Sequence, residues 1–230
     1  MTNGNCKYFK GFSSSAANFL KDLKENNNKP WFEKNKDIYK HLLLAPMQHL
    51  VMDMNDYFAE LDPLIDTTPA VGKTISRIYR DTRFSKDKSP YRDTMWATFK
   101  RSSKDWASSP AFFFEISPYT YRYGMGFFSA DTHTMELFRE RIDTYPEKFK
   151  KTIAFYSKQN VFTLEGDKYK RILDKTKPAD ILDWYQRKNL YLVCNKSIDD
   201  VLFGSELVHE LKSNFTLLAG LYHYLNEIKK

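Results

Sequence analysis

The sequence predicts an α+β fold, a single domain in which a mainly antiparallel sheet from the middle of the chain is covered by N- and C-terminal helices. Three observations support it. Apolar residues recur at helical spacing over 13–65, β-branched and aromatic residues gather in short runs over 74–128, and mainly helical spacing returns over 133–230. With 42% hydrophobic residues and no linker-like stretch, we expect one domain over 1–230.

The first region is predicted to contain three helices. Serines at 13–15 precede the first helix, which we expect to end at the asparagines 26–28. Pro30 stands at the predicted start of the second helix, because proline fits the first helical turn. Pro46 is predicted to open the third helix, and Pro63 to close it.

The middle region is predicted to form the sheet. We expect its strands at 75–79, 95–99, 112–116 and 119–128. Ser117 and Pro118 separate the last two strands, which predicts a hairpin. In its second arm Tyr119, Tyr121 and Tyr123 alternate with small or polar residues, so the three rings are predicted to share one face of the sheet.

The last region is predicted to be mainly helical. We expect helices at 135–142, after Pro146, after Pro178 and along the final residues, with strands at 161–164 and 190–194. Thr144 and Glu147 have the spacing of a capping box, in which the two side chains would satisfy free N–H groups at the start of a helix.

Several site and compartment classes are not predicted. No apolar run is long enough to span a membrane and no secretion signal is present, so we expect a cytoplasmic protein. Cys6 and Cys194 are too far apart in the sequence to indicate a structural zinc site or a disulfide framework. The Gly72-Lys73-Thr74 segment lacks the earlier glycine of a phosphate-binding P-loop, and 124–126 lies within a strand pattern, so no nucleotide motif is predicted.

The most unusual feature is a basic stretch, residues 77–92. It carries six lysines and arginines against Asp81 and Asp87, a charge of +6 − 2 = +4 out of +7 for the chain. Apolar and aromatic residues are interspersed with these charges, unlike in a solvated tail. The stretch therefore predicts an ordered basic site.

The pattern R-x-x-R-D-x-R-F-x-x-D-K-x-x-Y, which runs from Arg77 to Tyr91, resembles the signature of the bacterial domain-of-unknown-function family 2461. The asparagines and aromatic residues from Asn27 to Tyr39 are similar in kind to that family. We expect the similarity to cover the full chain. The resemblance implies a motif and no particular reaction.

We expect the basic stretch to bind a small anionic, phosphate-bearing ligand, because guanidinium groups match phosphate oxygens in geometry. Whether catalysis follows is left open, as are cofactors and the oligomeric state. Asp81 is predicted to orient an arginine or act as a base, and His133 is a second acid–base candidate. No metal site is predicted. The expected ligand-binding residues are Arg77, Tyr79, Arg80, Arg83, Lys88 and Tyr91.

Two alternatives stay open. A nucleic-acid-binding module would use the same stretch with further cations, and the tyrosines at 119, 121 and 123 would stack against bases, although an alternating aromatic strand is more often half-buried. A structural clasp would instead pair Asp81 and Asp87 with nearby cations and place Phe84 and Tyr91 in the core, with the function in a protein–protein interface. The further nucleic-acid contacts would be Lys100, Arg101, Lys104 and Arg122.

Overall fold

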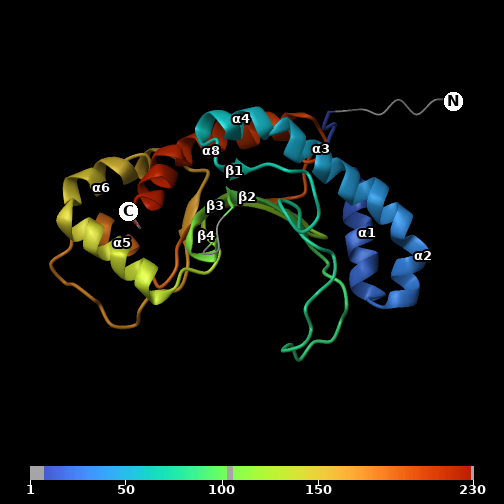
Figure 1. Cartoon of the computed structure of the whole chain (residues 1–230), viewed down its shortest axis with the longest axis horizontal. Coiled ribbons are helices and arrows are strands. Elements are labelled where there is room, and N and C mark those ends of the chain that lie inside the picture. Colours follow the sequence, from blue (N-terminus) through green and yellow to red (C-terminus); the bar gives the residue numbers. More distant parts are fainter. Residues whose placement is uncertain (1–7, 103–105, 229–230) are drawn as a thin grey trace. The chain divides into compact units, whose positions relative to one another are not determined.

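The computed structural model describes residues 8–102 and 106–228, which form a six-stranded antiparallel sheet with helices before and after it (Figure 1). This arrangement confirms the predicted α+β class. The strands follow the spatial order β1-β2-β3-β4-β6-β5. Their bounds are β1 Ile65–Asp66, β2 Met95–Arg101, β3 Pro110–Ile116, β4 Thr120–Phe127, β5 Thr163–Glu165 and β6 Tyr191–Ser197.

The hairpin predicted around Ser117 is confirmed by the turn that joins β3 to β4. The Ser117 backbone N–H donates to the carbonyl of Thr120 at 2.9 Å, and the Ser117 hydroxyl donates to the same oxygen at 2.8 Å. At the edge of the sheet β5 pairs antiparallel with β6, and Thr163 lies opposite Val193. Side-chain and backbone bonds therefore fix the turn and the edge.

Contacts divide the chain into two compact units. The first contains the described residues of Met1–Phe99, Phe113–Tyr123 and Asn195–Lys212. The second contains those of Lys100–Phe112, Gly124–Cys194 and Ser213–Lys230. The central strands and the last helix contribute residues to both, and the single domain over 1–230 stays a prediction.

Among the described residues of the first unit, four α-helices precede the sheet, and α1 and α2 lie side by side (Figure 1). Pro46 lies in the first turn of α3, as predicted, but a π-helical turn over Lys40–Leu44 joins α2 to α3 without a loop. Ala45 donates its N–H to Lys40, five residues back, directly before the proline that lacks an N–H. The helices are α1 Ser14–Glu25, α2 Lys29–Tyr39, α3 Ala45–Asp53 and α4 Asn55–Leu61.

The strand predicted at 75–79 is wrong. This segment makes only isolated bridges, from Ile75 to Val71 and Ala97 and from Tyr79 to Tyr91. The backbone N–H of Trp96 donates to the Ser76 hydroxyl at 3.0 Å instead of to a backbone carbonyl. The Ser76 hydroxyl thus occupies the place of a backbone acceptor, and the hydrogen-bond ladder between this segment and β2 is interrupted there.

The second unit contains α5 Thr132–Thr144, α6 Pro146–Ile153, α7 Ala179–Tyr185 and the C-terminal part of α8 Glu206–Asn226. The capping box predicted before α6 is wrong, because the Thr144 hydroxyl donates to the carbonyl of Glu140 at 2.8 Å and no side chain caps α6. Across the described chain, no helix combines the length and apolar character needed to cross a membrane.

Candidate functional site

The basic stretch folds back on itself within the first unit, and we call residues 77–92 the basic hairpin. Its two arms are joined at the antiparallel bridge between Tyr79 and Tyr91. The N–H of Arg80 donates to the Pro90 carbonyl at 2.9 Å, and the N–H of Arg92 donates to the Ile78 carbonyl at 2.8 Å. The arms are therefore extended, which fixes where the basic side chains emerge.

Asn27, which follows α1, attaches the basic hairpin to the N-terminal helices. Its side-chain amide donates to the carbonyl of Tyr91 at 2.9 Å and accepts the N–H of the same residue, also at 2.9 Å. Phe32 of α2 stacks on the Tyr91 ring with centroids 4.1 Å apart, and Tyr91 is buried. The two segments that resemble one family in sequence are thus in direct contact.

A groove of about 480 Å³ lies where these segments meet, and we call it the basic groove. Three cationic side chains and two carboxylates line it, giving +3 − 2 = +1. All of its residues belong to the first unit. They are Lys24, Asn27, Arg80, Asp87, Ser89, Tyr91, Arg92, Asp93 and Thr94.

The two carboxylates of the basic groove are already engaged. Asp87 accepts the hydroxyl of Ser89 at 2.6 Å and pairs with the guanidinium of Arg80. These hydrogen bonds, from Ser89 and then from Arg80, hold the pKa of Asp87 well below its usual range, so the carboxylate stays ionised. Asp93 lies 3.6 Å from the ammonium of Lys24.

Arg92 differs from the other cations of the groove. Its guanidinium carbon lies 4.9 Å from the ring centroid of Trp96, and it forms no ion pair with any carboxylate in the described chain. A guanidinium held against an aromatic face keeps its N–H edge available for an anion. Arg92 is therefore the groove's uncompensated charge.

Asp81 and Arg83 form an exposed ion pair outside the basic groove. The Arg83 Nε donates to Asp81 at 3.0 Å and a terminal nitrogen donates at 2.7 Å. These hydrogen bonds lower the pKa of Asp81 to about 2. A carboxylate with so low a pKa is a poor base near neutral pH, and these two hydrogen bonds fix the guanidinium of Arg83 beside it.

The remaining predicted ligand residues are spread along the basic hairpin. Arg80 and Tyr91 line the basic groove, whereas Arg77, Tyr79 and Lys88 do not. The Lys88 ammonium donates to the Thr82 carbonyl at 2.9 Å. Arg77 is exposed, and its guanidinium runs past Gly72.

His133, the second acid–base candidate, lies in the second unit. It is the second residue of α5 and is exposed. The side chain of Asp131 caps this helix by accepting the N–H of Thr134 at 2.7 Å. In the part of the chain that the structure describes, no three histidine, cysteine or acidic side chains gather as they would around a metal ion; Cys6 lies outside this part.

The tyrosine platform of the nucleic-acid alternative is not accessible on β4. Tyr121 and Tyr123 are each 1% exposed, so no base can reach their rings. Their hydroxyls donate to Asp199 at 2.9 Å and to Glu210 at 2.6 Å. Of the three tyrosines only Tyr119, which lies before β4, is exposed, and the strand itself is buried from Tyr123 to its end.

The additional cations of the nucleic-acid alternative have other partners or lie outside the described residues. Arg122 pairs with Glu115 at 2.8 Å. The ammonium of Lys100 lies 3.2 Å from the ring centroid of Trp106. Lys104 lies outside the described residues.

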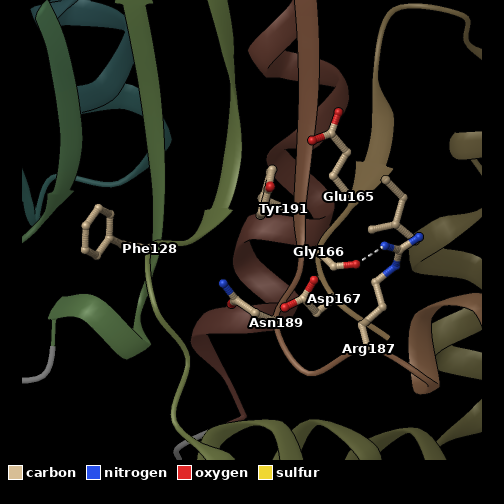
Figure 2. Close-up of a pocket in the computed structure, with 8 residues that line it drawn as sticks. Phe128, Glu165, Gly166, Asp167, Arg187, Asn189 and Tyr191 are labelled. Atoms are coloured by element: carbon tan, nitrogen blue, oxygen red, sulfur yellow. Dashed lines mark hydrogen bonds between the residues drawn. The ribbon is translucent and has the colours of Figure 1, made fainter. Parts of the chain in front are cut away.

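A second hollow, of about 620 Å³, lies within the second unit (Figure 2). Arg187 is buried at its edge, where it donates to the carbonyl of Gly166 at 2.7 Å and pairs with Asp183 at 3.2 Å. Its charge is thus engaged, while Glu165 and Asp167 give the lining a net charge of +1 − 2 = −1. This hollow is poorly suited to an anion.

The sequence did not predict Lys24 as a site residue. It placed Arg92 in the basic stretch but did not predict that Arg92 binds the ligand. Lys24 lies more than fifty residues before the basic hairpin, and nothing in its surroundings marks it. The asparagine that brings α1 to the groove, Asn27, belongs to the N-terminal segment that resembles the family. The family resemblance of that segment was the sequence signal that could have indicated a contact between α1 and the basic hairpin.

Comparison with known proteins supports the resemblance. No curated protein matches the chain. A family model described as "Conserved hypothetical protein (DUF2461)" matches residues 15–224, which include all but the first residue of α1, Asn27 and the whole basic hairpin. Because the match covers nearly the whole chain, the protein belongs to the DUF2461 family of conserved hypothetical proteins.

Proposed function

We propose that the basic groove binds a small anionic ligand through a phosphate group. The observation that carries the proposal is Arg92, which lies against Trp96 in a groove with two further cations and has no carboxylate partner among the described residues. Phosphate oxygens would complete the hydrogen bonds of this guanidinium and balance its charge.

The other groove residues support the same ligand chemistry. Arg80 uses one terminal nitrogen for Asp87, and its other N–H groups are available to a second acceptor. Its side chain is 24% exposed, so an ion pair with a ligand would be screened less than one on the open surface. Lys24 and the hydroxyl of Thr94 add a charge and a donor.

The groove is pre-organised by contacts that need no ligand. Asn27 holds Tyr91 by two backbone hydrogen bonds, and Arg92 follows directly in the chain. Rigid placement reduces the entropy lost on binding, which favours affinity from few contacts. We therefore propose binding as the function of the groove and leave Asp81 as an orienting group of the basic hairpin.

Thermal unfolding against inorganic phosphate, pyrophosphate, sugar phosphates and nucleotides tests the proposal. A ligand at about 100 times its Kd stabilises the folded chain by about 2.7 kcal/mol, which raises the unfolding midpoint. We expect Arg92→Ala to abolish this rise, because the variant removes the uncompensated guanidinium.

Arg77→Ala is the matched control, since Arg77 is an exposed arginine of the same hairpin that does not line the groove. It should keep the ligand-induced rise. If both variants lose the rise equally, general charge attraction accounts for binding and the groove does not. If no phosphate compound raises the midpoint of the wild type, the proposal is wrong.

A further inference from the structure

Phe84 is almost fully exposed at the end of the basic hairpin. Its side chain is 94% exposed, whereas Tyr91 of the same hairpin is 2% exposed. The chain turns beside it, where the N–H of Ser85 donates to the Thr82 carbonyl at 3.3 Å. The core position expected for Phe84 in a structural clasp is therefore wrong, and its ring is available to a partner. The loop that carries residue 84 is drawn in teal-green in Figure 1.

One cation lies near the ring in space, and two more follow it in the sequence. The guanidinium carbon of Arg83 lies 5.7 Å from the centroid of Phe84. Lys86 and Lys88 are exposed and form no ion pair with a carboxylate anywhere in the described residues. We call residues 81–89 the tip: an accessible aromatic face with cations on both sides of it in sequence.

We infer that the tip binds single-stranded nucleic acid, with Phe84 stacked on a base and Lys86 and Lys88 beside the phosphates. Every base has a flat face that an aromatic ring can cover, so one exposed ring is sufficient for stacking. The cations supply the sequence-independent attraction to the backbone. A duplex hides its base faces, so it is a poorer ligand for Phe84.

The composition of the tip favours nucleic acid over a membrane surface. Phe84 is the single apolar residue among 81–89, and the segment also carries Asp81 and Asp87. Membrane attachment needs several buried apolar groups or a long basic segment. The inference is also independent of the function proposed for the basic groove, because Phe84 does not line it.

Fluorescence anisotropy of a labelled single-stranded oligothymidine, titrated with the full chain, tests the inference. We expect Phe84→Ala to weaken binding roughly 5- to 150-fold, the range found for losing one base–aromatic stack. Phe84→Trp should retain binding, because indole also stacks. Since Phe84 is exposed, its alanine variant should keep the wild-type unfolding midpoint and the response of the groove to small phosphates.

The salt dependence gives a second readout. For single strands, the logarithm of the binding constant falls with the logarithm of salt by about 0.7 for each phosphate contact. Replacing Lys86 and Lys88 together by alanine should reduce this slope by about 1.4 if each contacts one phosphate. Polyphosphate, which has charge but no bases, should bind wild type and Phe84→Ala equally.

Three results would overturn the inference. The first is equal affinity of wild type and Phe84→Ala for the single strand at the same salt. The second is binding of a duplex as tightly as of the single strand, with the same dependence on Phe84. The third is a combination of two observations: vesicles of anionic phospholipid bind the wild type but not Phe84→Ala, and oligonucleotide binding is the same for both proteins. This result would assign the tip to a membrane surface instead.

Discussion

At the scale of single residues, Asn27 is the side chain on which the proposed site depends most. One amide satisfies both backbone groups of Tyr91, a residue that is itself 2% exposed. A buried backbone group that loses its partner is costly, whereas a surface hydrogen bond contributes little. Asn27 is therefore expected to position the groove rather than to bind ligand directly.

Replacing Asn27 by alanine should lower the free energy of unfolding by about 2 kcal/mol, because two part-buried hydrogen bonds are lost. It should also reduce the midpoint rise produced by phosphate compounds. Denaturant unfolding measures the first effect. Asn26→Ala is the control, since that amide donates only to the exposed carbonyl of Asp22. Equal losses in the two variants would contradict a special role for Asn27.

Unlike Asn27, the Asp81–Arg83 ion pair is expected to contribute little to stability. Both side chains are more than half exposed, so water solvates Arg83 when its partner is neutral. Asp81→Asn should leave the urea midpoint close to that of the wild type. A large drop in the midpoint would show that the pair holds the basic hairpin together, as the structural clasp requires.

Some of these residues were predictable from the sequence and others were not. The cluster of charge with aromatic residues located Arg80 and Tyr91, which do line the groove. Lys24 was missed because its contact spans a long separation in sequence. The structural-clasp alternative placed Phe84 in the core because phenylalanine is apolar. The turn that exposes this residue cannot be recognised from the hydrophobicity of the sequence.

At the scale of elements, close backbone packing explains the glycines of β4. A methyl group placed at Gly124 would lie 1.9 Å from the carbonyl oxygen of Leu192, and one at Gly126 would lie 2.3 Å from the Cβ of Tyr191. Both glycines lie within β4, as the strand pattern predicted, and these distances show that the neighbouring strand leaves no room for a side chain. By contrast, Gly220 in α8 has open space where a side chain would lie.

This contrast gives a paired prediction. Gly124→Ala should lower the free energy of unfolding by roughly 1–3 kcal/mol, the usual range for overpacking, because the backbone of β6 cannot move away freely. Gly220→Ala should stabilise it by about 0.5–1 kcal/mol, because alanine is the better helix former. Calorimetric or denaturant unfolding compares the two. A Gly124→Ala variant as stable as the wild type would contradict the packing described for β4.

Helices, hairpin and turns were predictable where short-range chemistry decides them. Pro30 and Ser117-Pro118 act on neighbouring residues, and the elements they predict are present. The first helix is also present, although the side chain of Ser13 at its start makes no capping hydrogen bond. The strand at 75–79 failed because the hydroxyl of Ser76 replaces a backbone acceptor. Such a substitution depends on the partner strand, which local sequence does not reveal.

At the scale of the whole molecule, buried tyrosines dominate the response to alkaline pH. Burial raises the pKa of Tyr39, Tyr185 and Tyr224 from 10.0 to about 12, and burial also raises that of Tyr121. A raised folded-state pKa stabilises the fold fully below the unfolded value, and this contribution is lost as the pH rises through the folded value. Stability should therefore hold up to pH 10 and fall between pH 10 and 12.

Absorbance of tyrosinate and far-ultraviolet circular dichroism, followed together in an alkaline titration, measure this effect. We expect one group of tyrosines to ionise near the ordinary pKa, and a second group to ionise only as helical signal is lost. If all the tyrosines ionise near pH 10 while the helical signal is intact, the burial of these rings is contradicted.

The fold class was predictable because composition and periodicity act over the whole chain. The division into two compact units was not, since each unit combines three separate segments and the strands contribute to both. Net charge likewise predicted an anionic partner for the chain as a whole. It did not distinguish the basic groove from the acidic hollow of the second unit, because that difference depends on which charges are already paired.

The most direct test of the proposed site is a crystal structure of the full chain grown with tungstate, a heavy-atom analogue of phosphate. We expect an anomalous peak in the basic groove within hydrogen-bond reach of Arg92 and Arg80, and we expect crystals of Arg92→Ala to lack this peak. Two results would contradict the proposed site. One is a well-ordered wild-type groove that holds no tungstate at a tungstate concentration that shifts the unfolding midpoint. The other is an anomalous peak found only elsewhere on the chain.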